Sequence, residues 1–183
     1  MTEEKLFEAV EFSPRKRHLR EWGDKVFRYC TFEDLDQDGV GFDGMMAYCT
    51  LRRVTLYWGF FNTAVLQNVE FEDCTFPGTS FRGCTFTDCT FTRCRFILDN
   101  LGGSCTIDGC VLSGCTFRGC TFEHRAATAE LREPAKSVDR DRRKLPRHLS
   151  EAQRPPQTIF TADNRIHGCT QTGCRGLFGV DGL

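Results

Sequence analysis

A large apolar residue recurs at every fifth position through the middle of the chain, with a small uncharged residue two positions before nearly every one. The repeat is strict from Met46 to Leu101 and resumes, after a slip of one residue, at Ile107. The large positions before the slip are Met46, Leu51, Leu56, Phe61, Leu66, Phe71, Phe76, Phe81, Phe86, Phe91, Phe96 and Leu101. A five-residue unit therefore organises most of the chain.

This five-residue spacing fits neither a straight helix nor a straight strand. Five steps along an α-helix turn a side chain by about 140°, so the large residues would wind around the helix. Five steps along a flat strand are an odd number, so the large residues would alternate between its two faces. A chain that turns a corner about every five residues keeps each large residue, and the small one before it, pointing inward. The pattern therefore predicts a narrow, square β-solenoid.

Between Trp22 and Glu123 the chain resembles the pentapeptide-repeat family, whose motif is a small residue, Asp or Asn, Leu or Phe, and two polar residues. The run FEDCTFPGTSFRGCTFTDCTFTRCRF, from Phe71 to Phe96, carries the resemblance. It implies an all-β fold, namely a right-handed quadrilateral β-helix with four pentads per coil. Threonine mostly replaces Asp or Asn at the second motif position. We therefore expect the family's fold with a different surface.

Four pentads per coil place residues twenty apart in the sequence one above another, at a strand spacing of about 4.8 Å. We therefore expect Phe91 to stack between Phe71 and Leu112, and Leu101 to lie inside the solenoid. The slip in the repeat predicts a bulge or short loop over residues 99–104.

The repeat lapses between Glu33 and Gly44, where the chain is acidic. Asp34, Asp36 and Asp38, followed by a glycine, have the D-x-D-x-D-G spacing with which a calcium loop places three carboxylates. The twelfth loop position is Met45 rather than glutamate, and no flanking helices are indicated. We therefore expect an acidic surface loop inserted between coils. We assign no metal, and the three aspartates remain the candidate ligands.

The sequence divides into four parts: an N-terminal cap over 1–21, the β-helix over 22–123, a polar basic linker over 124–158, and a C-terminal cap or homodimer contact over 159–183. The formal charge is −5 over 22–123 and +4 over 124–183. Neither excess indicates nucleic acid or an anionic membrane as a partner. The sequence has no secretory signal pattern and no apolar run of about 18 residues, so we expect a cytoplasmic location.

Ten of the twelve cysteines occupy the inward small position of a pentad. A free cysteine packs there as a compact apolar residue, and a cytoplasmic location disfavours disulfides. The histidines have no evident nucleophile or paired carboxylate, and the sequence contains no glycine-rich phosphate loop. We therefore expect no enzymatic activity and no cofactor.

One coil differs from the others at its outward positions, where four aromatic residues accompany two arginines. These residues are Tyr48, Tyr57, Trp58, Phe60, Arg52 and Arg53. Such a composition is typical of protein interfaces, so we predict that a partner protein binds here. Five acidic residues would extend this surface toward a basic partner: Glu33, Asp34, Asp36, Asp38 and Asp43. In the alternative interpretation the N-terminal segment, with Leu6, Phe7 and Val10, folds back over the aromatic residues.

The resemblance also implies functions without catalysis. Some pentapeptide-repeat proteins bind DNA gyrase or related topoisomerases, imitate duplex DNA and protect against quinolone-type poisons. We expect a non-enzymatic protein-binding solenoid, with a topoisomerase as one partner class. The alternatives are an immunity protein that neutralises a toxin, and a general scaffold or targeting module. The outward arginines weaken the acidic field that DNA mimicry needs.

Overall fold

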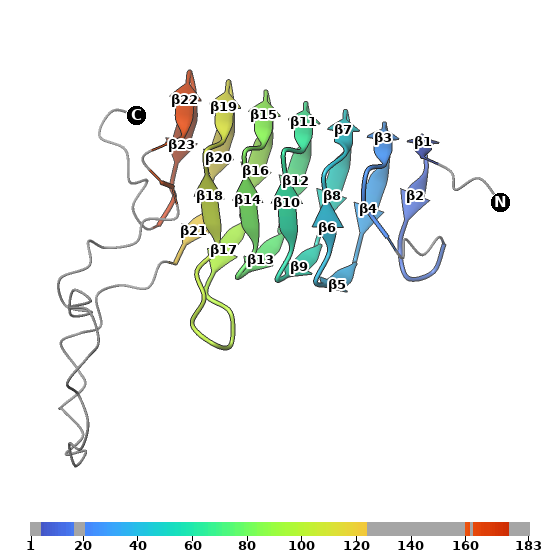
Figure 1. The fold of residues 1–183 in the computed structure, drawn as a ribbon, viewed down its shortest axis with the longest axis horizontal. Coiled ribbons are helices and arrows are strands. Elements are labelled where there is room, and N and C mark those ends of the chain that lie inside the picture. Colours follow the sequence, from blue (N-terminus) through green and yellow to red (C-terminus); the bar gives the residue numbers. More distant parts are fainter. Residues whose placement is uncertain (1–4, 17–20, 124–159, 162, 176–183) are drawn as a thin grey trace, which may run out of the picture.

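The computed structural model describes residues 5–16, 21–123, 160–161 and 163–175. Within these ranges the chain forms 23 short strands and no helix. The strands stack into four parallel sheets that form the sides of a column (Figure 1). The predicted quadrilateral β-helix is therefore confirmed. We number its sides one to four in the order in which the chain passes through them.

The first side contains β1 (Leu6–Glu8), β3 (Val26–Arg28), β7 (Met45–Ala47), β11 (Val65–Gln67), β15 (Thr85–Thr87), β19 (Val111–Ser113) and β22 (Arg165–His167). The second side contains β2 (Glu11–Phe12), β4 (Thr31–Glu33), β8 (Thr50–Arg52), β12 (Glu70–Glu72), β16 (Thr90–Thr92), β20 (Thr116–Arg118) and β23 (Thr170–Thr172). The third side contains β5 (Asp36–Asp38), β9 (Thr55–Tyr57), β13 (Thr75–Pro77), β17 (Arg95–Ile97) and β21 (Thr121–Phe122). The fourth side contains β6 (Gly41–Phe42), β10 (Phe60–Asn62), β14 (Ser80–Arg82) and β18 (Thr106–Asp108).

The corners of the column explain why its strands are so short. The residue after each strand commonly has a positive φ, for example 54° at Tyr48, 51° at Arg53 and 50° at Trp58. This left-handed conformation turns the chain out of the strand direction. The next pentad then begins on the next side, so each pentad forms one side and one corner of the square.

Phenylalanine rings stack along the column, and cysteine side chains pack between them. The ring of Phe91 lies 4.6 Å from that of Phe71 and 4.7 Å from that of Phe117, nearly parallel to both. The thiol of Cys94 donates to the carbonyl oxygen of Phe71 at 3.4 Å. All ten cysteines predicted to point inward are buried and free. The predicted packing role of the thiols is therefore confirmed.

The acidic segment that we expected as an inserted loop forms strands within a coil of the β-helix, so that prediction was wrong. Its strands β5 and β6 pair with β9 and β10, and Leu35 and Val40 fill the inward small positions. Val26 pairs with Met45, nineteen positions on, so this coil is one residue shorter than a regular coil of twenty. The polar residue Gln37 occupies a central strand position, which concealed the pentad in the sequence.

The slip in the repeat is a loop over residues 98–104 between β17 and β18. It adds six residues to the coil, so Phe91 pairs with Phe117, 26 positions on, rather than with Leu112 as predicted. Leu101 lies in this loop with its side chain 77% exposed, so its predicted burial was also wrong. Leu101 matches the five-residue spacing by coincidence, and the spacing alone could not separate a loop from a pentad.

Strands from both terminal segments cover the ends of the column. Residues 5–16 supply β1 and β2, which pair with β3 and β4. This segment continues the solenoid, so the alternative in which it folds back over the aromatic residues was wrong. At the other end β22 and β23 pair with β19 and β20, and Phe160 is buried. The predicted linker over 124–158 lies outside the described residues, and a homodimer contact through the C-terminal segment stays a prediction.

Asn164 fastens the last coil to the one before it. Its side-chain Oδ1 accepts a hydrogen bond from the backbone N–H of Cys110 at 2.7 Å. Its Nδ2 donates to the carbonyl oxygens of Ile107 at 2.6 Å and Thr161 at 3.0 Å. One amide group therefore satisfies three backbone groups where the solenoid ends.

Candidate functional site

The outward aromatic residues of the predicted interface lie at different corners of the square. Tyr48 stacks on Tyr29 at the corner between the first and second sides, with the ring centroids 5.3 Å apart. Tyr57, Trp58 and Phe60 lie around the corner between the third and fourth sides. The predicted single patch was therefore wrong. Residues ten apart lie two sides apart when a coil has twenty residues, so this separation could have been read from the sequence.

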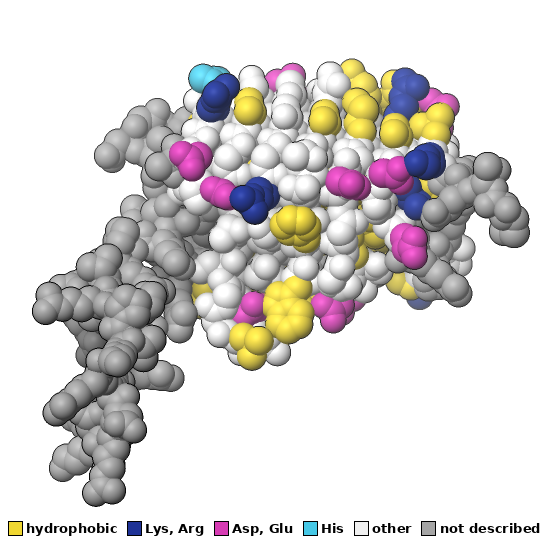
Figure 2. All heavy atoms as spheres, in the orientation of Figure 1, with side chains coloured by type: hydrophobic (Ala, Val, Ile, Leu, Met, Phe, Trp, Pro, Cys, Tyr) yellow, Lys and Arg dark blue, Asp and Glu magenta, His cyan; other side chains and the backbone are white. Residues whose placement is uncertain are grey.

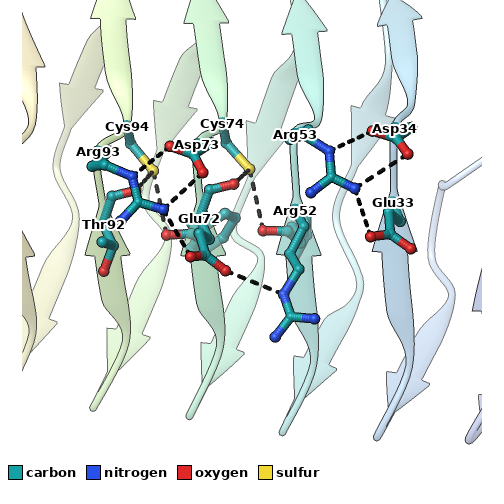
Figure 3. A network of polar contacts seen from close by, with 12 residues as sticks. Glu33, Asp34, Arg52, Arg53, Glu72, Asp73, Cys74, Thr92, Arg93 and Cys94 are labelled. Atoms are coloured by element: carbon teal, nitrogen blue, oxygen red, sulfur yellow. Dashed lines mark hydrogen bonds and ion pairs between the residues drawn. The ribbon is translucent and has the colours of Figure 1, made fainter.

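Arg52 and Arg53 belong to a ladder of charges along the second side (Figure 3). Arg53 binds Glu33 and Asp34 in the preceding coil, each at 2.6 Å, and Arg52 lies 3.2 Å from Glu72 in the next coil. Arg52 therefore pairs with the coil that follows it, whereas Arg53 pairs with the coil that precedes it.

The ladder continues at Arg93, which binds Glu72 at 2.8 Å and Asp73 at 2.7 Å. Hydrogen bonds from the arginines hold the pKa of Asp34 and of Asp73 below the usual aspartate value. These pairs are exposed, and such pairs contribute only about 0–1 kcal/mol each. Acidic and basic residues therefore neutralise each other along this part of the second side.

A different arrangement connects Trp58 with the loop over 98–104. The indole Nε1 of Trp58 donates to Oδ2 of Asp99 at 2.6 Å. The backbone N–H of Asn100 donates to the hydroxyl of Tyr57 at 3.1 Å, and the rings of Tyr57 and Trp58 lie 5.0 Å apart. We call Tyr57, Trp58, Phe60 and residues 98–104 together the loop corner.

Asp99 also holds the loop in shape from within. Its Oδ1 accepts backbone hydrogen bonds from Leu101 at 2.8 Å and Gly103 at 2.7 Å. The hydrogen bond from Trp58 is the main reason why the pKa of Asp99 lies below the usual aspartate value. The carboxylate is therefore charged at neutral pH and joins both arms of the loop to the solenoid.

Gly78 lies beneath this junction. A Cβ atom at this position would come within 2.7 Å of Oδ2 of Asp99 and 2.9 Å of the Trp58 ring. Its φ of +60° also favours glycine. The absence of a side chain at this position lets Trp58 and Asp99 meet.

The loop corner exposes apolar surface: the side chains of Trp58 and Phe60 are 43% and 46% exposed, and that of Leu101 is 77% exposed. In Figure 2 hydrophobic side chains gather with acidic ones near the lower edge, where Figure 1 shows the loop after β17. The sequence pointed to Trp58 and Asp99 separately. The two residues are 41 positions apart, which is about two coils. This spacing could have predicted that they lie near the same corner of the column.

The remaining acidic candidates lie outside the charge ladder. Asp36 and Asp38 are exposed on β5, on the third side, and Asp38 pairs in register with Tyr57. Asp43 is exposed between β6 and β7. Asp34 is bound to Arg53 as described above. Within the described ranges no three His, Cys, Asp or Glu side chains are grouped as metal ligands.

A column of four parallel sheets, built from five-residue units with phenylalanine and cysteine inside, defines a quadrilateral β-solenoid. The family model for pentapeptide repeats matches residues 64–97 in eight copies. Residues 64–97 are therefore pentapeptide repeats.

The solved structures that are similar to this chain include three pentapeptide-repeat structures. Two are trypsin-treated variants of QnrB1, described as a plasmid-mediated fluoroquinolone resistance protein. They are 12% and 15% identical, with TM-scores of 0.35 and 0.30, over 64% of this chain and 72% and 79% of theirs. The third is the pentapeptide-repeat protein Rfr23 from the cyanobacterium Cyanothece 51142, 8% identical with a TM-score of 0.41, over 82% of this chain and 90% of its own.

The search of curated proteins gave no match. Among the described residues, no helix is long and apolar enough to cross a membrane.

Proposed function

We propose that this chain is a non-enzymatic protein-binding solenoid whose loop corner contacts the partner. The observation that carries the proposal is an exposed apolar loop tied to the solenoid by Trp58 and Tyr57. Exposed apolar groups held in one conformation favour binding, because little conformational freedom is lost when the partner docks. Aromatic residues at such positions are typical centres of protein interfaces.

The charges around the loop corner indicate a partner with a basic surface. Asp36 and Asp38 lie on the third side, next to the strand that carries Tyr57, and neither has an ion pair among the described residues. The ladder on the second side is internally paired, so any attraction of a basic partner comes from the third side. A topoisomerase site that normally binds DNA has this chemistry, and so does the basic active site of a nuclease toxin.

A DNA gyrase supercoiling assay tests the topoisomerase proposal. We expect the wild-type protein, at micromolar concentration, to change supercoiling or to protect gyrase from a quinolone. Leu101→Asp should abolish the effect, because it places a charge at the most exposed apolar position of the loop. Tyr48→Ala is the matched control, since Tyr48 is also half-exposed but lies at another corner.

The two partner classes give different results in this assay. No response of gyrase to wild-type protein would reject the topoisomerase proposal and leave a toxin as the partner, to be tested by rescue of a toxin encoded beside this chain. Equal activity of the Leu101→Asp variant and the wild type would reject the loop corner as the binding site. Circular dichroism should show the same fold for all three proteins.

A further inference from the structure

The outer surface of the first side carries a row of aliphatic side chains. The first residue of each strand on this side points outward, and these residues pair in register from coil to coil. In order along the column they are Leu6, Val26, Met45, Val65, Thr85, Val111 and Arg165, and all of them except Thr85 and Arg165 are apolar. We call them the aliphatic row.

The second side, which also has seven strands, has no such row. The corresponding residues of the second side are Glu11, Thr31, Thr50, Glu70, Thr90, Thr116 and Thr170. On the third and fourth sides the same position holds mostly threonine, charged or small residues, with Phe60 as the exception, so the fold itself does not require aliphatic residues there. Of the two seven-stranded sides, only the first carries the aliphatic row. The row therefore needs an explanation other than the fold.

Leu6 and Val65 are the exposed apolar members of the row, while Val26, Met45 and Val111 are partly buried. The side chains of Leu6 and Val65 are 50% and 40% exposed, and Tyr29 and Tyr48, at the adjoining corner, are 51% and 49% exposed. Figure 2 shows hydrophobic side chains gathered along the upper edge, over the strands of the first side. Extended apolar surface of this kind marks interaction sites.

The order of residues along the aliphatic row is close to symmetric about its middle strand, β11. Val26 lies two strands before Val65 and Val111 lies two strands after it, while Met45 and Thr85 are its immediate neighbours. A two-fold axis parallel to β11 would place Val65 of one copy on Val65 of another. The same axis would place Val26 on Val111 and Met45 on Thr85, whereas Leu6 would lie on Arg165 at the two ends of the row.

The residues beside the row are complementary under the same axis. It would bring β1 onto β22, so that Glu8 faces His167 of the second copy, and β7 onto β15, so that Tyr48 faces Asp88. The bulky Tyr29 would face Gly114, which has no side chain. An acid therefore meets a base, and a hydroxyl donor meets a carboxylate.

From this pattern we propose that a second copy of this chain docks on the first side, with the two columns antiparallel and β11 at the two-fold axis. Seven strands at about 4.8 Å spacing make a face about 29 Å long, and a three-residue strand makes it about 10 Å wide. The two faces together would bury about 580 Å², roughly half of the ~1,200 Å² at which stable protein interfaces begin. The dimer is therefore a weak, reversible one, separate from the loop corner.

Sedimentation equilibrium over a wide range of protein concentration tests the proposal. We expect the average mass of the wild type to rise from one chain toward two as concentration increases through the micromolar to millimolar range that weak interfaces show. Val65→Asp should remain a monomer throughout, because it would place two like charges together at the axis. Thr90→Asp, at the same strand position on the second side, should behave as the wild type.

A crosslinking experiment tests whether the Val65 side chains of the two copies meet at the axis. It also gives a second test in case the Val65→Asp variant does not fold. Val65→Cys should give a disulfide-linked dimer under mild oxidation, whereas Thr90→Cys should not. The proposal is overturned by a wild type that stays monomeric at all concentrations, or by a Val65→Asp variant that dimerises normally, as a C-terminal contact would allow. Leu101→Asp should leave the mass unchanged, which separates this proposal from partner binding.

Discussion

At the scale of single residues, Asp99 and Gly78 together determine the shape of the loop corner. Asp99 accepts hydrogen bonds from Trp58, Leu101 and Gly103, so one carboxylate joins a corner of the solenoid to both arms of the loop. Gly78 leaves the space in which this junction forms. A change at Gly78 should therefore alter the loop without touching an exposed residue.

We predict that Gly78→Ala displaces the loop. The new Cβ atom would lie within 3 Å of both Asp99 and Trp58, in addition to a cost of roughly 1–2 kcal/mol for a left-handed alanine. Trp58 should lose its hydrogen bond, and its fluorescence should shift. Gly83→Ala is the matched control, because Gly83 has the same φ of +60° and its nearest neighbour would be 3.5 Å away. Equal fluorescence changes in the two variants would contradict the prediction.

At the scale of strands and loops, the sequence predicts inward positions well because each pentad carries its own signal. A large residue at the centre and a small one two before it specify a strand and its orientation without reference to distant residues. Errors arose where that local signal was ambiguous. Gln37 concealed a real pentad, and Leu101 imitated one.

The candidate site could be predicted only in part, because it depends on which coils lie next to each other. Outward exposure of Trp58 and Phe60 follows from the motif. Their separation from Tyr48, and the contact of Trp58 with Asp99, follow from the number of residues per coil. The conformation of the loop over 98–104 depends on hydrogen bonds to a single carboxylate, which no periodic pattern encodes.

The last coil offers a test at this scale. We predict that Asn164→Ala speeds hydrogen exchange in β19 and β22, because the backbone groups of Cys110 and Ile107 lose their side-chain partner. A buried backbone group left without a partner costs about 1–3 kcal/mol. The carbonyl oxygen of Ile107 still accepts the N–H of Thr161, so the main loss is at the N–H of Cys110. Exchange in β7 should not change. The control Asn62→Ala, at an exposed position on β10, should leave exchange in β19 and β22 unchanged. If exchange in β19 and β22 is the same in both variants, Asn164 does not stabilise the last coil.

At the scale of the whole molecule, the solenoid is a one-dimensional stack in which each coil contacts only its neighbours. Stability in such proteins is approximately a sum over repeats and their interfaces. The loss of one central ring should therefore weaken two interfaces at once. Phe91 is such a ring, since it stacks on Phe71 on one side and Phe117 on the other.

We predict that Phe91→Ala lowers the free energy of unfolding by about 3–5 kcal/mol and divides the unfolding transition into two steps. The coils on either side of the cavity would no longer be coupled through the ring stack. Chemical denaturation followed by circular dichroism measures the energy, and hydrogen exchange locates the two steps. The control Thr92→Ala, on the same strand, should leave a single unfolding transition. A single transition in Phe91→Ala as well would show that the coils stay coupled without the Phe91 ring.

The cysteines stacked between the rings allow the order in which the coils open to be followed by thiol modification. Cys74, Cys94, Cys120 and Cys174 follow one another along one line of the interior, and of these only Cys174 is partly exposed. A thiol reagent in solution would modify each residue only when its own coil separates from the next. If the column unzips from its C-terminal end, Cys120 is modified before Cys94, and Cys94 before Cys74. The kinetics of modification would therefore give the direction of unfolding in the unaltered protein.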